Sequence, residues 1–129
     1  MEFPAAVPEI PVSDITRAIT YYKNVLGFNV DWGGSEGGIA GISKGNCRIF
    51  LTDGPFRQQY KNGNPVLVWL NLDSKEEVNE LYSSWKAKQA NIISAPESKQ
   101  WGLYEFTIAD PDRNLFRVFY DFGTAEKTK

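Results

Sequence analysis

The side chains best suited to chemistry in this sequence are two carboxylates and an arginine that fall among aromatic residues on predicted strands. Glu9 and Glu105 could attract a cationic ligand or act as an acid–base pair. They could equally form internal salt bridges with Arg48 or Arg117. Arg117 in turn could bind a carboxylate or phosphate through two parallel hydrogen bonds, or tie two strands together through Glu105. The residues alone leave these alternatives open.

The sequence contains no histidine and a single cysteine, which removes several classes of enzyme chemistry. Without histidine there is no Ser–His or Cys–His nucleophile pair and no His-containing zinc or iron site. One cysteine excludes an internal disulfide and a thiolate cluster, and is typical of a reducing compartment. Because nothing in the sequence would lower its pKa, we interpret Cys47 as structural.

Four tryptophans are candidates for flat contact surfaces. Trp85 falls on the apolar stripe of a predicted helix, so we expect it in the core. Trp69 takes a strand position that suits either the core or a ligand platform. Trp101, which precedes Gly102, could stack on a ligand or pack in a dimer. Trp32 ends a predicted strand and could serve either purpose.

Composition and charge are those of a folded protein without a nucleic-acid partner. The 129 residues are 42% hydrophobic and 14% aromatic, enough for one domain with an apolar core. A formal charge of −2 argues against nucleic acid, for which a clustered basic excess is expected. No apolar run approaches the roughly 18 residues of a membrane span, and the first residues do not resemble a signal peptide. We therefore expect no membrane partner and a cytoplasmic location.

Two stretches with helical periodicity would position these side chains. Residues 15–26 carry apolar side chains spaced three and four apart, with Ser13 or Asp14 as a cap and Gly27 as a left-handed end. The second helix begins after Ser74 with a Ser-x-x-Glu capping box, carries one apolar face and ends near residue 89.

The remaining segments read as short strands separated by turns. The candidate strands are Val7–Val12, Phe28–Trp32, Ile39–Ser43, Arg48–Thr52, Val66–Leu72, Asn91–Ser94, Tyr104–Ala109 and Leu115–Tyr120. The order strand, helix, three strands therefore occurs twice. Within a single domain over residues 1–129, module one spans about 5–55 and module two about 65–121, with a polar linker at 56–64 and a frayed tail at 122–129.

Each module is too small to hide both faces of its sheet. We therefore expect an α+β fold in which the helices cover the outer faces and the inner faces enclose a trough. Alternation along the strands assigns side chains to one face or the other. The side chains predicted to line the trough are Val7, Glu9, Arg48, Phe50, Thr52, Leu67, Trp69, Asn71, Glu105, Thr107, Leu115, Arg117 and Phe119. Aromatic surface with a few charges is typical of a small-molecule site.

Several runs resemble the vicinal-oxygen-chelate superfamily, which includes glyoxalase I, extradiol dioxygenases, fosfomycin resistance enzymes and bleomycin resistance proteins. The first run is Pro11-Val12-Ser13-Asp14, followed by Ile19-Thr20-Tyr21-Tyr22 and Val25-Leu26-Gly27-Phe28. In the second half, Trp101-Gly102 and Asp110-Pro111-Asp112-Arg113-Asn114 are similar to the family's "WG…DPDGN" run. The resemblance implies paired βαβββ modules that form an incomplete barrel around a trough, and usually a homodimer.

The resemblance also implies four metal-ligand positions, which this chain does not fill with ligands. They fall at Val7, Phe50, Leu67 and Arg117. Three of these side chains lack a donor atom, and arginine would repel a cation. We therefore expect no metal and no cofactor, and the metal-free bleomycin resistance type is the nearer match.

The resulting hypothesis is metal-independent sequestration of a small aromatic or drug-like molecule in the cleft of a homodimer. The alternative is a lyase, isomerase or other glyoxalase-superfamily enzyme that acts through carboxylates or an unrecognised metal site; a dimeric interaction module without a ligand is a third class. The predicted ligand-binding residues are Glu9, Trp32, Phe50, Trp69, Trp101, Glu105, Arg117 and Phe119. No catalytic residue is assigned.

Two turns carry further expectations. Residues 33–38 are rich in glycine, but they join two strands and not a strand and a helix, so we expect a hairpin tip and no phosphate site. Arg113 replaces the usual glycine of the DPDGN turn, where a positive φ is favoured. We therefore expect modest strain at Arg113.

Overall fold

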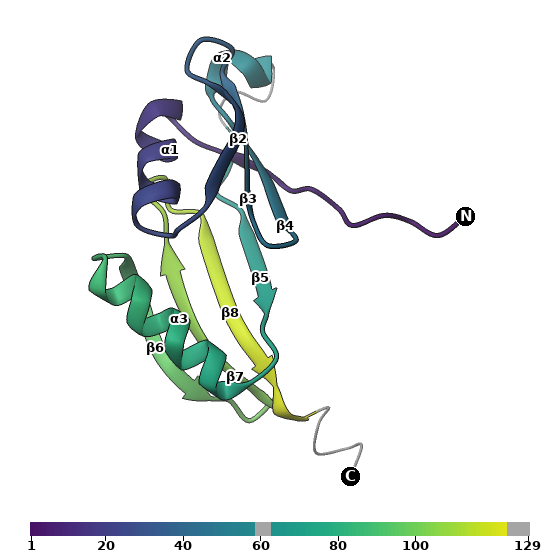
Figure 1. The fold of residues 1–129 in the computed structure, drawn as a ribbon, viewed down its shortest axis with the longest axis vertical. Helices are drawn as coiled ribbons and strands as arrows, with labels where there is room; N and C mark the ends of the chain where they lie inside the picture. Colours follow the sequence, from purple (N-terminus) through teal and green to yellow (C-terminus); the bar gives the residue numbers. More distant parts are fainter. Residues whose placement is uncertain (59–62, 124–129) are drawn as a thin grey trace. The chain divides into compact units, whose positions relative to one another are not determined.

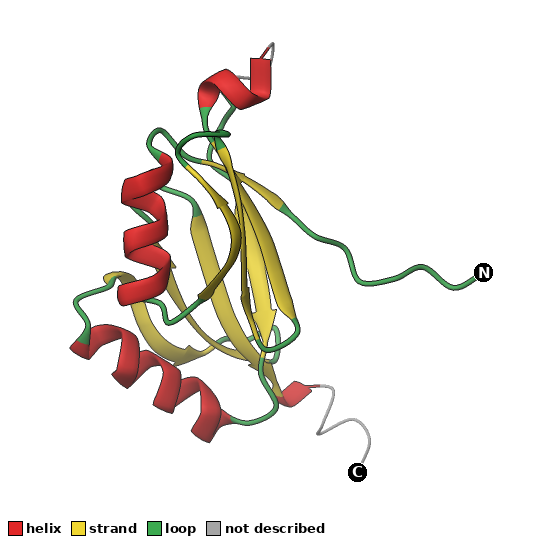
Figure 2. Cartoon of the chain, turned by 45° about the horizontal axis from the view of Figure 1, so that its top comes forward, coloured by secondary structure: helices red, strands yellow, loops and turns green. Residues whose placement is uncertain are grey.

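The computed structural model describes residues 1–58 and 63–123, and the chain divides into two compact units, Met1–Pro65 and Val66–Lys129. Each unit holds one four-stranded open sheet with a long helix along one face (Figures 1 and 2). The predicted α+β fold of two βαβββ modules is therefore confirmed. We keep the names module one and module two for these units.

The described residues of module one form six elements. They are β1 (Glu9–Pro11), α1 (Ile15–Asn24), β2 (Asn29–Gly34), β3 (Ile39–Lys44), β4 (Cys47–Thr52) and α2 (Gly54–Arg57). The strand order is β1-β4-β3-β2, in which β1 runs parallel to β4 and the other pairs are antiparallel.

Module two repeats this topology. Its elements are β5 (Leu67–Asn71), α3 (Lys75–Ala87), β6 (Asn91–Ser98), β7 (Leu103–Ala109) and β8 (Leu115–Asp121). The strand order is β5-β8-β7-β6, with β5 parallel to β8. The strands β1 and β5, and likewise β4 and β8, therefore take equivalent positions in the two sheets.

Local capping determines where the long helices begin. The Asp14 carboxylate accepts a hydrogen bond from the Arg17 amide at 3.0 Å, which satisfies a free N–H of the first turn of α1. In the predicted capping box, the Ser74 hydroxyl accepts from the Glu77 amide at 3.1 Å, while the Glu77 carboxylate accepts from the Asp73 amide at 2.8 Å.

The core of each module lies between its sheet and its long helix. In module one, Tyr22 of α1 is fully buried, as are Ile49 and Leu51 of β4. In module two, Trp85 of α3 is 2% exposed and meets Phe106 of β7 edge to face, with ring centroids 5.8 Å apart. The prediction that Trp85 belongs to the core is confirmed.

Some predicted boundaries differ from the structure. The linker predicted at 56–64 overlaps the short helix α2, which the Asp53 side chain caps by accepting from the Phe56 amide at 3.0 Å; residues 59–62 lie outside the described residues. β6 extends four residues beyond its predicted end at residue 94 through two register shifts. Of the predicted tail, Gly123 donates its amide to Gly102 O at 2.9 Å, and residues 124–129 lie outside the described residues.

The turn between β7 and β8 confirms the expected backbone at Arg113, whose φ is +69°. The Asp110 carboxylate holds this turn by accepting from the amides of Asp112 and Asn114 at 2.8 and 2.9 Å.

Within the described residues, no helix is long and apolar enough to cross a membrane.

Candidate functional site

The face of the module-two sheet that points away from α3 carries an aromatic and charged cluster. We call the sheet face opposite the long helix the uncovered face of each module. Trp69 of β5 lies beside Arg117 of β8 in the parallel register, and the Arg117 guanidinium carbon lies over the indole ring at 5.2 Å from its centroid. Phe119 of β8 meets Trp69 edge to face at 5.6 Å. Trp69 keeps 45% of its surface exposed, because the alternation of β5 turns Val68 and Leu70 to the other face as predicted.

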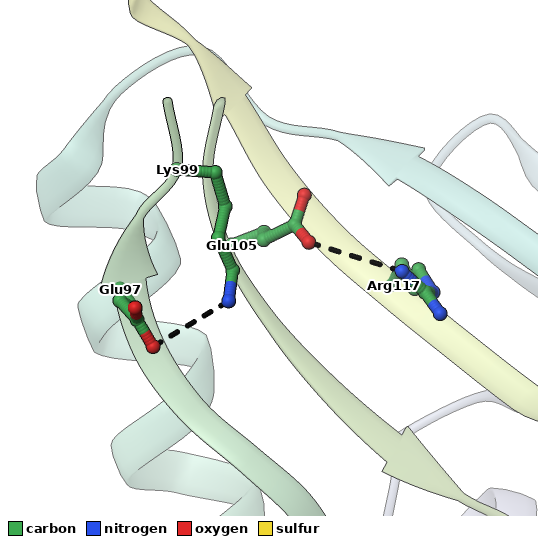
Figure 3. Close-up of polar contacts among 4 residues, drawn as sticks. All are labelled: Glu97, Lys99, Glu105 and Arg117. Atoms are coloured by element: carbon green, nitrogen blue, oxygen red, sulfur yellow. Dashed lines mark ion pairs between the residues drawn. The ribbon is translucent and has the colours of Figure 1, made fainter. Parts of the chain in front are cut away.

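Glu105 of β7 completes this cluster. It pairs with Phe119 in the β7–β8 register, and its Oε1 lies 4.0 Å from Arg117 Nη1. The Glu105 side chain is only 4% exposed and Arg117 is 35% exposed. Among the residues that the structure describes, neither Oε2 of Glu105 nor Nε of Arg117 has a hydrogen-bond partner, although both atoms are buried. In Figure 3, one carboxylate oxygen faces Arg117 and the other points away from it.

The predicted salt bridge between these two residues is therefore present, but in a loose form. A charge-assisted hydrogen bond spans about 2.7–2.9 Å, so a single contact of 4.0 Å leaves most of the pairing capacity of both groups unused. We name Trp69, Glu105, Arg117 and Phe119 the module-two cluster.

Trp101 lies apart from the module-two cluster, in the turn between β6 and β7. Its ring is 58% exposed, and Lys99 Nζ lies over it at 5.9 Å from the centroid. Lys99 also pairs with Glu97 at 3.4 Å, as Figure 3 shows. Among the residues predicted in module two, the structure therefore brings four together and leaves Trp101 at the hairpin tip.

The uncovered face of module one joins different side chains. Residues from the four strands stand in one transverse row, Glu9–Phe50–Gly41–Trp32, through the backbone register. Trp32 of β2 lies across Gly41 of β3, where a Cβ would collide with the indole, and meets Phe50 edge to face at 5.1 Å. Arg48 lies over the Phe50 ring, with its guanidinium carbon 5.8 Å from the ring centroid.

Among the described residues of module one, Glu9 bonds to Thr52 and forms no ion pair with Arg48. Its Oε2 accepts a hydrogen bond from the buried Thr52 hydroxyl at 3.1 Å. Arg57 of α2 donates to the Thr52 hydroxyl at 3.3 Å and to the Thr52 carbonyl. The sequence did not indicate the parts played by Gly41, Thr52 and Arg57; a glycine at an uncovered strand position was the one available signal, since it permits a close approach.

Comparison with known proteins decides the family of this fold. The model of the Glyoxalase/Bleomycin resistance protein/Dioxygenase superfamily matches residues 5–118. The chain belongs to this superfamily. The predicted resemblance is thereby confirmed.

Relatives in this superfamily include bleomycin resistance proteins. Those of Geobacillus stearothermophilus and Staphylococcus aureus are 26% identical over 128 residues, covering 88% of this chain and 94% of each relative. A bleomycin-binding protein solved in complex with bleomycin has a TM-score of 0.71 at 21% identity, covering 92% of this chain and 98% of that chain. A lactoylglutathione lyase from Agrobacterium tumefaciens has a TM-score of 0.74 at 18% identity, covering 92% and 95%. These structural likenesses show the fold.

The four positions that the resemblance assigns to metal ligands carry side chains that do not suit a metal ion. Val7 and Phe50 are half-buried apolar side chains, Leu67 is 47% exposed, and Arg117 belongs to the module-two cluster. In the part of the chain that the structure describes, no three His, Cys, Asp or Glu side chains gather closely enough to hold a metal ion. We therefore derive no step through a metal.

Cys47 of β4 is half-buried, and this burial raises the pKa of its thiol. The neutral thiol is therefore favoured near pH 7, which agrees with a structural role and not with a nucleophile.

Proposed function

We propose that this protein binds a small, aromatic-containing, drug-like molecule without a metal ion, and that it lowers the free concentration of that molecule by stoichiometric sequestration. The exposed aromatic face of module two, at Trp69, is the observation that carries the proposal. A tight complex needs no chemistry, because each bound molecule is removed from solution in proportion to the protein made.

The composition of the module-two cluster supports this proposal. Ligand sites combine large apolar contact with a few polar groups that fix orientation. Trp69 and Phe119 supply the aromatic surface, and Glu105 and Arg117 supply charges of opposite sign that leave the cluster formally neutral. Such a face suits an uncharged planar group better than a strongly charged one.

The relatives support the drug-like character of the ligand. Bleomycin resistance proteins are similar to this chain over 88% of its length, and a bleomycin-binding protein shares its fold. The family's metal-ligand positions hold side chains without suitable donor atoms, which favours the binding branch of the superfamily over its metal-dependent enzymes.

We further propose that the protein is a homodimer. The edge strands β2 and β6 are largely exposed, and exposed apolar side chains such as Ile93 and Trp101 accompany them. Exposed edges and aromatics are a liability that pairing removes. Light scattering at micromolar concentration should give twice 14.6 kDa, and the monomer mass would contradict the dimer.

Equilibrium dialysis against bleomycin and a panel of other glycopeptide and planar aromatic antibiotics tests the function. We expect saturable binding of at least one compound, unchanged by EDTA, with the compound recovered chemically intact. Elemental analysis of the purified protein accompanies this test. Conversion of the compound, loss of binding in EDTA, or about one transition metal ion per chain would contradict metal-independent sequestration.

A further inference from the structure

One face of the Trp69 ring, on which a planar ligand could stack, is occupied by a side chain of the protein itself. The Arg117 guanidinium is planar and lies over the indole, with its carbon 5.2 Å from the ring centroid. A guanidinium on an aromatic face uses the same surface that a stacked ring would need. A ligand that stacks there must therefore displace Arg117.

The structure also contains the place to which Arg117 can move. Glu105 Oε2 and Arg117 Nε are both buried, and neither has a hydrogen-bond partner within residues 1–58 and 63–123. Oε1 already faces Arg117 Nη1 at 4.0 Å. Nε–H and Nη2–H lie on one edge of the guanidinium, so a rotation that brings this edge to Glu105 replaces the single long contact with a bidentate arginine–carboxylate pair, in which both distances are about 2.8 Å.

We propose that Arg117 is a ligand-responsive cover of the Trp69 ring, and that Glu105 receives it when an uncharged planar aromatic group stacks on Trp69. This inference rests on the proposed function and specifies how its site selects a ligand. Glu105 is a positioning residue, because it acts on the ligand through Arg117 and does not contact it. Arg117 is a specificity residue, because a weakly stacking group does not displace it.

The mechanism is a shift between two arrangements of one side chain. A ligand that binds only the uncovered arrangement has an affinity reduced by the fraction of molecules that remain covered. A stronger ion pair between Arg117 and Glu105 raises the fraction of molecules in which the Trp69 ring is uncovered. A weaker ion pair leaves Arg117 on the indole. The carboxylate of Glu105 therefore increases ligand affinity only while Arg117 is present.

A double-mutant cycle in the full chain tests this coupling. The probe is isoquinoline, which is planar and uncharged at pH 8, and the readout is its Kd from the indole N–H signal of Trp69, assigned with Trp69→Phe. We expect Glu105→Gln to weaken isoquinoline binding about fivefold in the wild-type background. In an Arg117→Met background, Glu105→Gln should change the Kd less than twofold.

A matched control comes from the neighbouring strand. Glu97 pairs with Glu105 in the β6–β7 register, so Glu97→Gln removes the same charge from the same sheet without touching Arg117. It should leave the Kd unchanged. Addition of isoquinoline should also slow hydrogen exchange at the Arg117 Nε–H, because that group becomes bonded to Glu105.

Two outcomes would overturn the proposal in distinguishable ways. Equal effects of Glu105→Gln with and without Arg117 would mean that Glu105 touches the ligand directly, which contradicts the arginine cover and leaves the proposed function standing. If saturating isoquinoline does not move the Trp69 signal, both the cover and the role of Trp69 in the proposed function are wrong.

Discussion

The two modules share one topology but present different uncovered faces. In module one, the tryptophan lies on β2 and reaches inward across Gly41 to Phe50, and Glu9 is exposed and bonded to Thr52. In module two, the tryptophan lies on β5 at the opposite edge of the sheet order, and the carboxylate is buried with an unpartnered oxygen.

Under the proposed function, the repeated fold assigns structure to one copy and recognition to the other. The polar groups of the module-one face are largely satisfied by its own residues, since Arg57 and Thr52 connect α2, β4 and β1. The module-two cluster retains unused hydrogen-bonding capacity beside an exposed indole. Buried polar atoms without partners are rare in native proteins, so this pair calls for an explanation, and the proposed movement of Arg117 to Glu105 supplies one.

The largest expected effect tests whether the stability of each module comes from the packing between its long helix and its sheet, and not from the uncovered face of the sheet. Trp85→Ala should lower the free energy of unfolding by about 3–5 kcal/mol, because it empties a buried site against Phe106. Trp32→Ala and Trp69→Ala should each cost about 1 kcal/mol, because both rings are more than two-fifths exposed. Urea denaturation measures all three, and equal costs would abolish the distinction between the faces.

A smaller effect tests the packing of Trp32 against Gly41 in module one. Gly41→Ala should expel the indole from the sheet and cost about 1–2 kcal/mol, because the new Cβ would occupy the space of the ring. The Trp32 fluorescence should shift to longer wavelength in water. Gly34→Ala is the control, since a Cβ there meets nothing within 4 Å. A change of emission in the control, or none in Gly41→Ala, would contradict the packing.

The smallest effect compares the equivalent turns of the two modules. Gly45 joins β3 to β4 at φ +59°, whereas Arg113 joins β7 to β8 at φ +69°. Arg113→Gly should raise the free energy of unfolding by about 0.5–1 kcal/mol, and Gly45→Ala should lower it by a similar amount. Thermal unfolding measures both changes. Shifts of the same sign in the two variants would show that backbone strain is not what distinguishes the turns.

Periodicity alone predicted the features that depend on local sequence. The two long helices follow from three- and four-residue spacing and from caps at Asp14 and Ser74. The exposure of Trp69 and its neighbourhood with Phe119 follow from strand alternation. The α2 helix was not predicted, because four residues are too few to show periodicity. Its local signals were the Asp53 cap before the helix and Pro55 in its first turn.

The contacts that the sequence did not predict depend on the register between strands. Trp32 reaches Gly41 through a register shift between Val30 and Trp32, which no single-strand pattern reveals. The pairing of Glu9 with Thr52 likewise joins residues from β1 and β4, whereas charge matching within module one suggested Arg48. Strand parity identified the face for Glu9 and Thr52, but not which neighbour each side chain contacts.

The central claim is that the uncovered face of module two contacts the ligand, and a titration of the tightest-binding antibiotic of the dialysis panel against wild type, Trp69→Ala and Trp101→Ala tests it most directly. Trp69→Ala should weaken binding by about 1–3 kcal/mol, which is roughly a 5- to 150-fold increase in Kd. Trp101→Ala, which changes an exposed ring at the β6–β7 turn, should have a smaller effect. A Kd that Trp69→Ala leaves within twofold of wild type, or no saturable binding to wild type, would contradict the account.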